Sequence, residues 1–248
     1  MATIAVGDIH GYLAPLSDLL TQLRAEVARD DTVVFLGDYI DRGPDSKGCI
    51  DAMLGFEQDI AGTVVYLRGN HEDWLLQTFR DFYRHSWVLG MDGYDTIRSY
   101  SPDAARIIRD AQREAGLGVY LERVPLPYDV FVDSMPTTHR MFFDRLQPYY
   151  RGPDGICVHG GLDASVARLE DQDVRACIWG TDGFPEDYCG DEVVAYGHLN
   201  NAAIDGDGWP RPRIIGSTIG LDTIAHGVLT AMRLSDRRLF QSARHDVR

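Results

Sequence analysis

The first third of the chain alternates short apolar runs with longer stretches of helical spacing. The apolar runs occupy residues 3–6, 32–36 and 63–67, and their length and β-branched content predict three strands. After the first run, the leucines at positions 13, 16, 19, 20 and 23 recur at helical spacing. This spacing predicts an amphipathic helix from Leu13 to about Ala28.

Two more helices are predicted after the second and third strands. One is expected to begin with Ser46 as its N-cap and to turn Ile50, Met53 and Leu54 inward. The other begins near residue 70 and carries the apolar residues Trp74, Leu75, Leu76 and Phe79. Strands that alternate with helices are typical of right-handed crossover units and a largely parallel sheet. In such sheets, functional sites form beyond the carboxyl ends of the strands.

The middle third has a different pattern. Residues 85–101 are rich in Gly, Trp and Tyr and show no clear period. Residues 102–116 predict a helix with Ile107, Ile108 and Ala111 facing inward, and residues 137–146 predict another. No linker, repeat or low-complexity tract marks a boundary. We therefore interpret residues 1–248 as a single domain with a helical, cap-like insertion at about residues 85–149.

The last third returns to strand patterns. Strands are predicted at residues 155–158, 193–196, 214–215 and 219–221, followed by a hairpin that joins residues 228–234 to residues 239–240. The whole pattern, strands and helices together, predicts an α/β fold.

Composition narrows the classes of function. The 248 residues include 38 acidic and 24 basic side chains, which gives a formal net charge of −14. This charge argues against non-specific binding to nucleic acid or to an anionic membrane. The four cysteines have no close-pair spacing, so they are expected to be reduced thiols. No stretch reaches transmembrane length and no secretion signal is recognisable, so we expect a cytoplasmic location.

Polar side chains of one chemical kind follow five of the predicted strands: Asp8, His10, Asp38, Asn70, His159 and His198. Taken alone, Asp8 and His10 would also suit a solvated turn. A mixture of carboxylate, amide and imidazole groups suits Mn²⁺, Fe or Zn²⁺ better than Ca²⁺ or Mg²⁺. Six ligands exceed what one tetrahedral ion needs, whereas two divalent ions that share a carboxylate would use them all. We therefore expect two divalent metal ions, with Mn²⁺ as the first choice.

Three of these segments are more specific. Gly7-Asp8-Ile9-His10-Gly11, Gly37-Asp38-Tyr39-Ile40-Asp41-Arg42-Gly43 and Gly69-Asn70-His71-Glu72 resemble the three-part signature of the calcineurin-like metallophosphoesterases. More closely, they resemble the phosphoprotein phosphatase family, which includes bacterial-type Ser/Thr protein phosphatases and symmetrical dinucleoside tetraphosphatases. His159-Gly160-Gly161 and Gly197-His198 are similar to the two later histidine motifs of that family. The resemblance implies two mixed β-sheets packed face to face with flanking helices, a four-layer sandwich.

The resemblance also implies a division of the ligands between two ions. Asp8 and His10 would hold one ion, and Asp38 would bridge both. The second ion would be held by three later residues, Asn70, His159 and His198. Two such cations lower the pKa of a bridging water, so that hydroxide is present at neutral pH. They also neutralise charge on the phosphoryl oxygens during in-line attack.

Three further residues are implied to be catalytic. His71 would protonate the leaving oxygen, and Asp41 would orient its imidazole and favour the charged form. Arg42 would clamp phosphate oxygens with its planar guanidinium. Two alternatives stay open from the residues alone. Arg42 could instead pair with Asp45 or Asp41, and His71 could be an ordinary residue at a helix start.

The chain departs from the family pattern after Trp179. The family usually places a second arginine a few residues later, but residues 180–188 contain none and hold three acids, Asp182, Glu186 and Asp187. We expect these acids to disfavour polyanionic substrates, because like charges repel. A substitute cation could come from Arg211 or Arg213. Farther on, His226 follows a late Leu221-Asp222-Thr223 element and is expected to pack rather than to act in the site.

Three functions compete. The preferred one is a Ser/Thr-type protein phosphatase that acts on a phosphorylated protein or a small phosphoester, without nucleic-acid or membrane partners. The alternative is a dinucleoside polyphosphate (tetraphosphate) or other nucleotide phosphohydrolase. Tyr94, Tyr100, Tyr149 and Tyr150 would be candidates to stack a base, although such rings are more often part of a core. A non-enzymatic scaffold is disfavoured by the intact set of ligands and catalytic residues.

Overall fold

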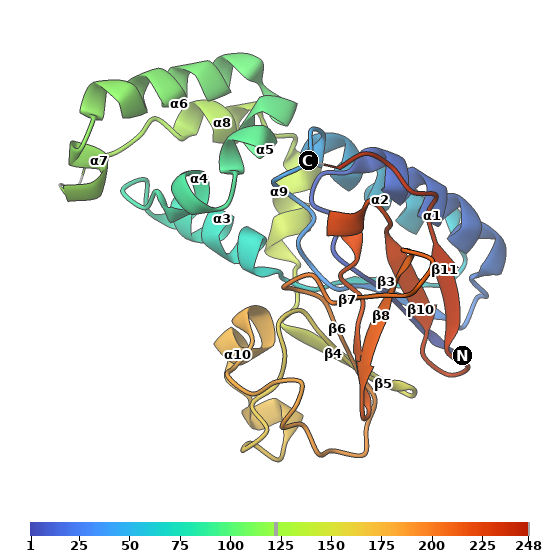
Figure 1. Cartoon of the computed structure of the whole chain (residues 1–248). Coiled ribbons are helices and arrows are strands. Elements are labelled where there is room, and N and C mark those ends of the chain that lie inside the picture. The colour runs from blue at the N-terminus through green and yellow to red at the C-terminus, as the bar shows by residue number, and fades with distance from the viewer. Residues whose placement is uncertain (122–123, 248) are drawn as a thin grey trace.

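Two β-sheets face each other at the centre of the structure, a computed structural model that describes residues 1–121 and 124–247 (Figure 1). Within these residues, the first sheet has the strand order β11-β10-β1-β2-β3 and the second the order β4-β5-β6-β9-β8-β7. The parallel pairing of β1, β2 and β3 confirms the predicted crossover units. Antiparallel partners at the edges make both sheets mixed.

The strands of the first sheet are β1 (Thr3–Val6), β2 (Thr32–Phe35), β3 (Thr63–Tyr66), β10 (Thr230–Arg233) and β11 (Arg238–Gln241). Those of the second are β4 (Tyr149–Gly152), β5 (Gly155–Val158), β6 (Val194–Tyr196), β7 (Ala202–Ile204), β8 (Pro210–Ile215) and β9 (Thr218–Gly220). Val6 pairs with Phe35, which pairs with Tyr66, so these three parallel strands end side by side.

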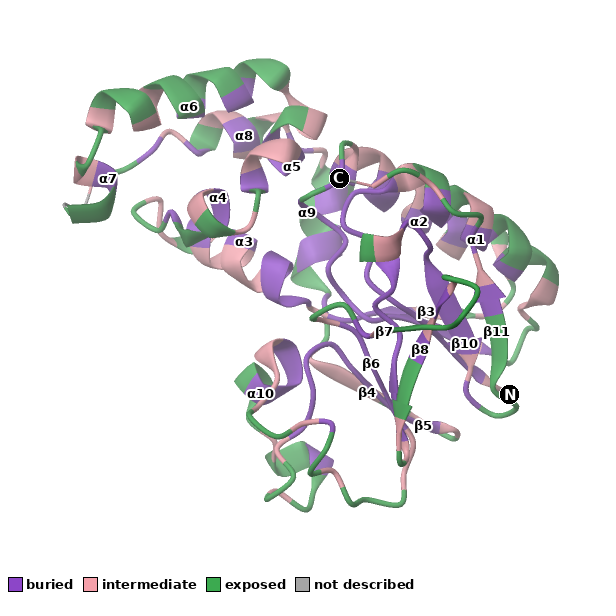
Figure 2. Cartoon of the chain, viewed as in Figure 1, coloured by how far each residue is buried: buried purple, intermediate pink, exposed green. Residues whose placement is uncertain are grey.

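The two faces of the first sheet have different partners, because side chains alternate along a strand. Ala5, Val34 and Val65 pack against Cys157 and Ala195 of the second sheet. The intervening residues face the helices α1 (Leu13–Glu26), α2 (Ser46–Asp59) and α3 (Asn70–Arg80). Behind the second sheet lies α10 (Val174–Trp179), so the chain forms four layers. Figure 2 shows the buried strands between the helices.

One predicted helix start is wrong by a residue. The N-cap of α2 is Asp45, whose carboxylate accepts a hydrogen bond from the Gly48 N–H. Ser46 is fully buried instead, and its hydroxyl accepts the N–H of Asp41. The carboxylate at position 45 already satisfies the helix end, so the serine is available to the neighbouring loop.

In the part of the middle third that the structure describes, there are six helices: α4 (Ser86–Gly90), α5 (Gly93–Tyr100), α6 (Pro102–Ala115), α7 (Gly118–Leu121), α8 (Asp129–Ser134) and α9 (Thr137–Asp144). We call residues 86–121 and 124–144 the helical segment; the predicted insertion also includes residues 122 and 123, which lie outside the described residues. Figure 1 shows this segment extending to one side of the sheets. Its rings join the core that covers the first sheet.

Two details of the helical segment differ from the prediction. Residues 85–101 form two helices although they show no period, because glycines interrupt the pattern and each helix buries few side chains, such as Trp87 and Ile97. Ile107 was expected to face inward but is 37% exposed, whereas Ile108 is buried. The inward stripe of α6 is narrow and runs through Ala104, Ala105 and Ile108. Among the described residues, no helix has both the length and the apolar character that crossing a bilayer requires.

Candidate active site

The loops that follow β1, β2, β3, β5 and β6 meet at one edge of the two sheets, because their strands end close together. They bring together all six side chains predicted to bind metal. Five of these are buried, with at most 4% exposure, and His198 is half-buried. Such burial of carboxylates and imidazoles is costly unless they are paired or bind a cation.

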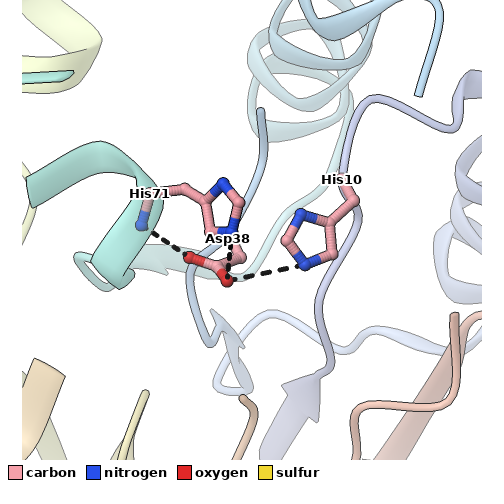
Figure 3. Close-up of side chains that lie close together, drawn as sticks. All are labelled: His10, Asp38 and His71. Carbon is pink, nitrogen blue, oxygen red and sulfur yellow. Dashed lines mark hydrogen bonds and ion pairs between the residues drawn. The ribbon is translucent and has the colours of Figure 1, made fainter. Parts of the chain in front are cut away.

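The first group of possible ligands surrounds Asp38 on one side (Figure 3). His10 Nε2 lies 3.5 Å from Asp38 Oδ2 and 3.9 Å from Asp8 Oδ2. His71 Nε2 lies 3.9 Å from the same Asp38 oxygen, and the backbone N–H of His71 donates to Asp38 Oδ1 at 3.2 Å. His10, Asp38 and His71 are therefore close enough together to hold one ion.

The second group lies on the other side of the same carboxylate. His159 Nε2 is 3.4 Å from Asp38 Oδ1 and 2.9 Å from Asn70 Oδ1. The rings of His159 and His198 are 5.2 Å apart, and both histidines group with Asp38. Asp38 thus belongs to both groups of ligands, which is the arrangement that a bridging carboxylate requires.

The tautomers of two histidines suit a metal. The Nδ1 atoms of His10 and His159 lie 3.1 Å and 3.0 Å from the backbone carbonyls of Ile40 and Leu36, and a carbonyl accepts only from N–H. When the ring is neutral, each Nε2 therefore faces the site without a proton. Burial by itself would lower the pKa of His159, but the Asp38 carboxylate outweighs it and raises the pKa, because Nε2 lies against the Asp38 and Asn70 oxygens. His10 Nε2 is buried and finds no hydrogen-bond partner among the residues that the structure describes, and burial lowers the pKa of His10, which keeps the ring neutral. A divalent cation would satisfy this atom, so these residues fit a metal centre.

The backbone of the site is held in an unusual conformation. Five site residues that are not glycine have positive φ angles: His10 (48°), Asp38 (53°), Asp41 (71°), Arg42 (62°) and His198 (63°). Such angles cost free energy for side chains with a Cβ and persist when the surroundings enforce them. Gly43 shows one cause, since a Cβ there would lie 2.3 Å from the His10 carbonyl oxygen.

Glu72 holds two of these loops together, a role that the sequence prediction did not include. Its carboxylate accepts the backbone N–H groups of Asp38, Tyr39, Ile40 and Gly69, at 2.8 to 3.3 Å. Burial, together with the Asp38 charge, raises the pKa of Glu72 to about 7. The signal was present in the sequence, because an acid at the third position of a helix commonly caps its start.

His71 and Asp41 form the predicted pair. His71 Nδ1 lies 2.8 Å from Asp41 Oδ2, and both side chains are buried. Burial by itself would lower the pKa of His71, but the Asp38 and Asp41 carboxylates outweigh it and raise the pKa. The helical segment completes this pair: Trp87 Nε1 donates to Asp41 Oδ2 at 2.8 Å, and Thr96 Oγ1 donates to Asp41 Oδ1 at 2.6 Å.

Arg42 lies at the open side of the site. Its Nη2 is 3.4 Å from His71 Nε2, and its side chain is exposed. Among the described residues it forms no ion pair with Asp41 or Asp45, the two alternatives weighed above. Its charge instead acts on the site: burial and the Asp222 and Asp38 charges raise the pKa of Asp8, which Arg42 opposes, and burial lowers the pKa of His198 to about 4, to which Arg42 adds.

The substitutes considered for the missing arginine are engaged elsewhere. Arg213 Nη2 donates to Glu186 Oε1 at 2.6 Å, and Arg211 forms ion pairs with Asp205 and Asp207 on its own hairpin. Trp179, after which the arginine was expected, donates to Asp73 at 3.1 Å and lies 5.2 Å from the Trp74 ring. His226 is half-buried in the short 3₁₀ turn Ile224–His226.

Comparison with known proteins adds the family. The sequence profile described as calcineurin-like phosphoesterase matches residues 1–227. The chain belongs to this family. Two solved structures support its fold. One, described as a candidate diadenosine tetraphosphatase, has a TM-score of 0.57 and 20% identity over 96% of this chain and 91% of its own. The other, a metallophosphoesterase from Sphaerobacter thermophilus, has a TM-score of 0.51 and 14% identity over 100% of this chain and 90% of its own. The predicted family and fold class are confirmed.

Curated members of the family carry more than one function. A symmetrical bis(5′-nucleosyl)-tetraphosphatase of Cellvibrio japonicus is 30% identical over 62% of this chain and 54% of its own length. Serine/threonine-protein phosphatase 1 of Salmonella typhimurium is 35% identical over 48% of this chain and 49% of its own length. The match thus spans about half of each of these relatives. A symmetrical tetraphosphatase of Pectobacterium atrosepticum is 25% identical over 97% of this chain and 94% of its length.

Proposed function

We propose that this chain is a dinuclear-metal phosphohydrolase that cleaves phosphate esters or anhydrides by in-line attack. The observation that carries the proposal is the shared Asp38 carboxylate. Histidine side chains gather on both of its sides, and the His71–Asp41 pair and Arg42 lie next to it.

The proposed ligands divide as the family resemblance implies. Asp8, His10 and Asp38 would hold one ion, and the second would be held by Asp38, Asn70, His159 and His198. A pair of divalent cations, when bound, would supply charge neutralisation for the phosphoryl oxygens and a nucleophilic water at neutral pH. Mn²⁺ is our choice for both ions, because the ligands combine carboxylate oxygen with imidazole nitrogen.

The chain's own groups would then act on the substrate. The guanidinium of Arg42 would bind two phosphoryl oxygens and orient them, since its planar fork matches their geometry. His71 would deliver a proton from Nε2 to the leaving oxygen, while Asp41 holds Nδ1–H and keeps the ring turned toward the site. The raised pKa of His71 supports this role, because the ring must carry a proton near neutral pH.

For the substrate, we favour a dinucleoside tetraphosphate, which reverses the order preferred from the sequence. Two relatives that align over nearly the whole chain are tetraphosphatases by name. One is the Pectobacterium protein above, and the other is the asymmetrical enzyme PrpE of Oceanobacillus iheyensis, which is 22% identical over 96% of this chain and 90% of its own length. The three acids of residues 180–188 also argue less strongly against a polyanionic substrate, since Arg213 offsets the charge of Glu186. A phosphorylated protein stays the second candidate because of the Salmonella phosphatase.

A panel assay tests the proposal. The Mn²⁺-loaded chain would be given diadenosine tetraphosphate, Ser/Thr phosphopeptides and an aryl phosphate, and kcat/KM would be compared. We expect the dinucleotide to give the highest value, chelation to abolish hydrolysis, and Mn²⁺ to restore it. A higher kcat/KM for the phosphopeptides would favour the second candidate, and full activity without metal would refute the proposed metal centre.

Two organisational predictions belong to this proposal. The chain is expected to act as one domain in which the helical segment serves as a cap beside the site. The cytoplasmic location and the lack of nucleic-acid or membrane partners stay predictions from composition.

A further inference from the structure

A cleft lies between α3, α4 and α7, outside the group of metal ligands. It has a volume of about 540 Å³. The side chains that matter for its chemistry are Trp74, Gln77, Tyr83, Arg84, Ser86 and Tyr120. None of them belongs to the sequence motifs, so the proposed function leaves the cleft without a role.

The cleft is in line with the catalytic end of α3. Asn70 and His71 form the first turn of this helix, and Trp74 and Gln77 follow Asn70 at spacings of four and seven residues. Residues at this spacing share one face of a helix. Trp74 and Gln77, which are half-buried, therefore lie about 6 Å and about 10 Å beyond Asn70 along the helix axis. A ligand whose phosphate reaches His71 could extend along this face into the cleft.

Two aromatic rings are exposed in the cleft, beside the exposed side chains of Arg84 and Ser86. Tyr120 is 66% exposed and Tyr83 is 45% exposed, which is unusual for rings of this size. Gly90 leaves the cleft open beside Trp74, since a Cβ built there would meet only the Trp74 ring edge, at 3.4 Å. Open aromatic faces next to a void are suited to stacking with a flat ligand.

The polar groups of the cleft are largely engaged with one another. The Gln77 amide donates to Asp73 and accepts from Arg84 Nη1, and the Thr78 hydroxyl donates to the Arg84 carbonyl. A peptide would bring backbone groups that find few free partners here. The lining contains a cation, Arg84, whose guanidinium also lies 3.7 Å from the Asp81 carboxylate, and among the described residues the lining itself contains no acid.

We propose that this cleft binds a nucleobase of a nucleoside polyphosphate substrate, stacked on Tyr120 and Trp74, while the ribose and phosphates run along α3 to His71. The assignment rests on the proposed phosphohydrolase function and names its substrate class. Stacking tolerates every base, so adenine and guanine dinucleotides bind with similar affinity.

Calorimetric binding to the Mn²⁺-loaded full chain separates this inference from the proposed activity. The probe is methylene-bridged diadenosine tetraphosphate, and inorganic tetraphosphate serves as the ligand without a base. Tyr120→Ala removes the most exposed ring, and Gly90→Leu fills the cleft over Trp74. Leu121→Ala is the matched control, because Leu121 lies next to Tyr120 on α7, is 79% exposed and does not line the cleft.

We expect Tyr120→Ala and Gly90→Leu each to raise the Kd of the dinucleotide about tenfold, within the range that stacking of one base supplies. Inorganic tetraphosphate should bind all variants alike, and Leu121→Ala should bind the dinucleotide like the unaltered chain. Equal dinucleotide affinity in all variants would overturn the base site, even if diadenosine tetraphosphate is hydrolysed. A selective loss of phosphopeptide turnover in Tyr120→Ala, with no change in dinucleotide binding, would also overturn it and assign the cleft to peptides. The expected Kd shifts without any dinucleotide hydrolysis would leave the base site standing and refute the proposed activity.

Discussion

The strand-end loops and the helical segment both reach His71 and Asp41, but they fix their side chains in different ways. In the loops, buried carboxylates accept backbone N–H groups, as Glu72 does from both the 38–40 loop and Gly69. In the helical segment, buried rings pack against one another, such as Trp87 against Phe131. Its direct bonds to the catalytic pair are those of Trp87 and Thr96 to Asp41.

The two regions should therefore differ in how well they tolerate substitutions. Directional bonds to buried charges define one geometry, whereas packed rings tolerate rearrangement if volume is kept. We therefore expect the loops to set the chemistry and the helical segment to set the substrate, with Asp41 as the link between them. Changes in the two regions should have effects of different size and kind.

The largest effect is expected at Asp38. Asp38→Asn removes the charge that both ligand groups share, so metal content and hydrolysis of every substrate should collapse together. Elemental analysis and kcat measured on the same preparation would check this. An Asp38→Asn variant that retains two equivalents of metal would refute the bridging role.

His71→Asn provides the contrast within the loops. It should keep its metal, because we propose His71 as a proton donor, yet lose roughly 10²- to 10⁴-fold in kcat with a poor leaving group. An activated aryl phosphate needs less protonation and should suffer less. His71 Nε2 also lies 3.9 Å from Asp38 Oδ2, so loss of metal in this variant would identify it as a ligand instead.

Removing the hydrogen bonds from the helical segment to Asp41 should have an intermediate effect. Thr96→Val and Trp87→Phe each delete one hydrogen bond to the buried Asp41 carboxylate. The first keeps the side-chain volume but also removes the hydroxyl that accepts the Asp41 N–H, whereas the second also leaves a small cavity. One bond to a charged group contributes about 1.5–3 kcal/mol, so we expect a loss of roughly tenfold or more in kcat for poor leaving groups. Metal content and aryl phosphate turnover should change little. Thr96→Ser, which keeps the hydroxyl, is the control, and equal losses for all leaving groups would contradict this role.

A smaller effect is expected at the acids of the 180–188 loop. Asp182 is exposed, and an exposed charge pair is worth about 1 kcal/mol before screening. Asp182→Asn should therefore lower the KM of an acidic phosphopeptide or a nucleotide a few-fold, with less effect at high salt and little on an aryl phosphate. If no KM changes, the 180–188 loop does not influence substrate binding.

The smallest effect, on stability and not on catalysis, is expected where α9 of the helical segment contacts α2. His139 of α9 lies 2.9 Å from Asp51 of α2 and 2.7 Å from the Tyr100 hydroxyl, and burial lowers its pKa although Asp51 opposes this. The unfolded chain then binds a proton more readily, so the free energy of unfolding should fall as pH drops below about 6.5. Urea denaturation from pH 7 to pH 5 would show this slope, and His139→Gln should flatten it without changing kcat at pH 7.5.

The sequence predicted the loops far better than the helical segment. Asp8, Asp38 and Asn70 follow strands directly, so their convergence could be inferred from the strand order alone. Trp87 and Thr96 were missed as partners of Asp41, because the contacts span 46 and 55 residues and leave no local pattern. The exposure of Ile107 could not be predicted for the same reason. Which face of α6 is buried depends on residues distant in sequence that pack against it.

The position of β1 has a consequence for how the protein is made. β1 lies between β2 and β10, and Ile4 pairs with Arg233. During synthesis, one edge of the strand that leads to Asp8 and His10 therefore stays unpaired until residues 230–233 of β10 have left the ribosome. An open edge is prone to pair with other chains. Nascent chains stalled before residue 230 should thus depend on chaperones and lack metal-binding capacity, although every ligand has already been translated.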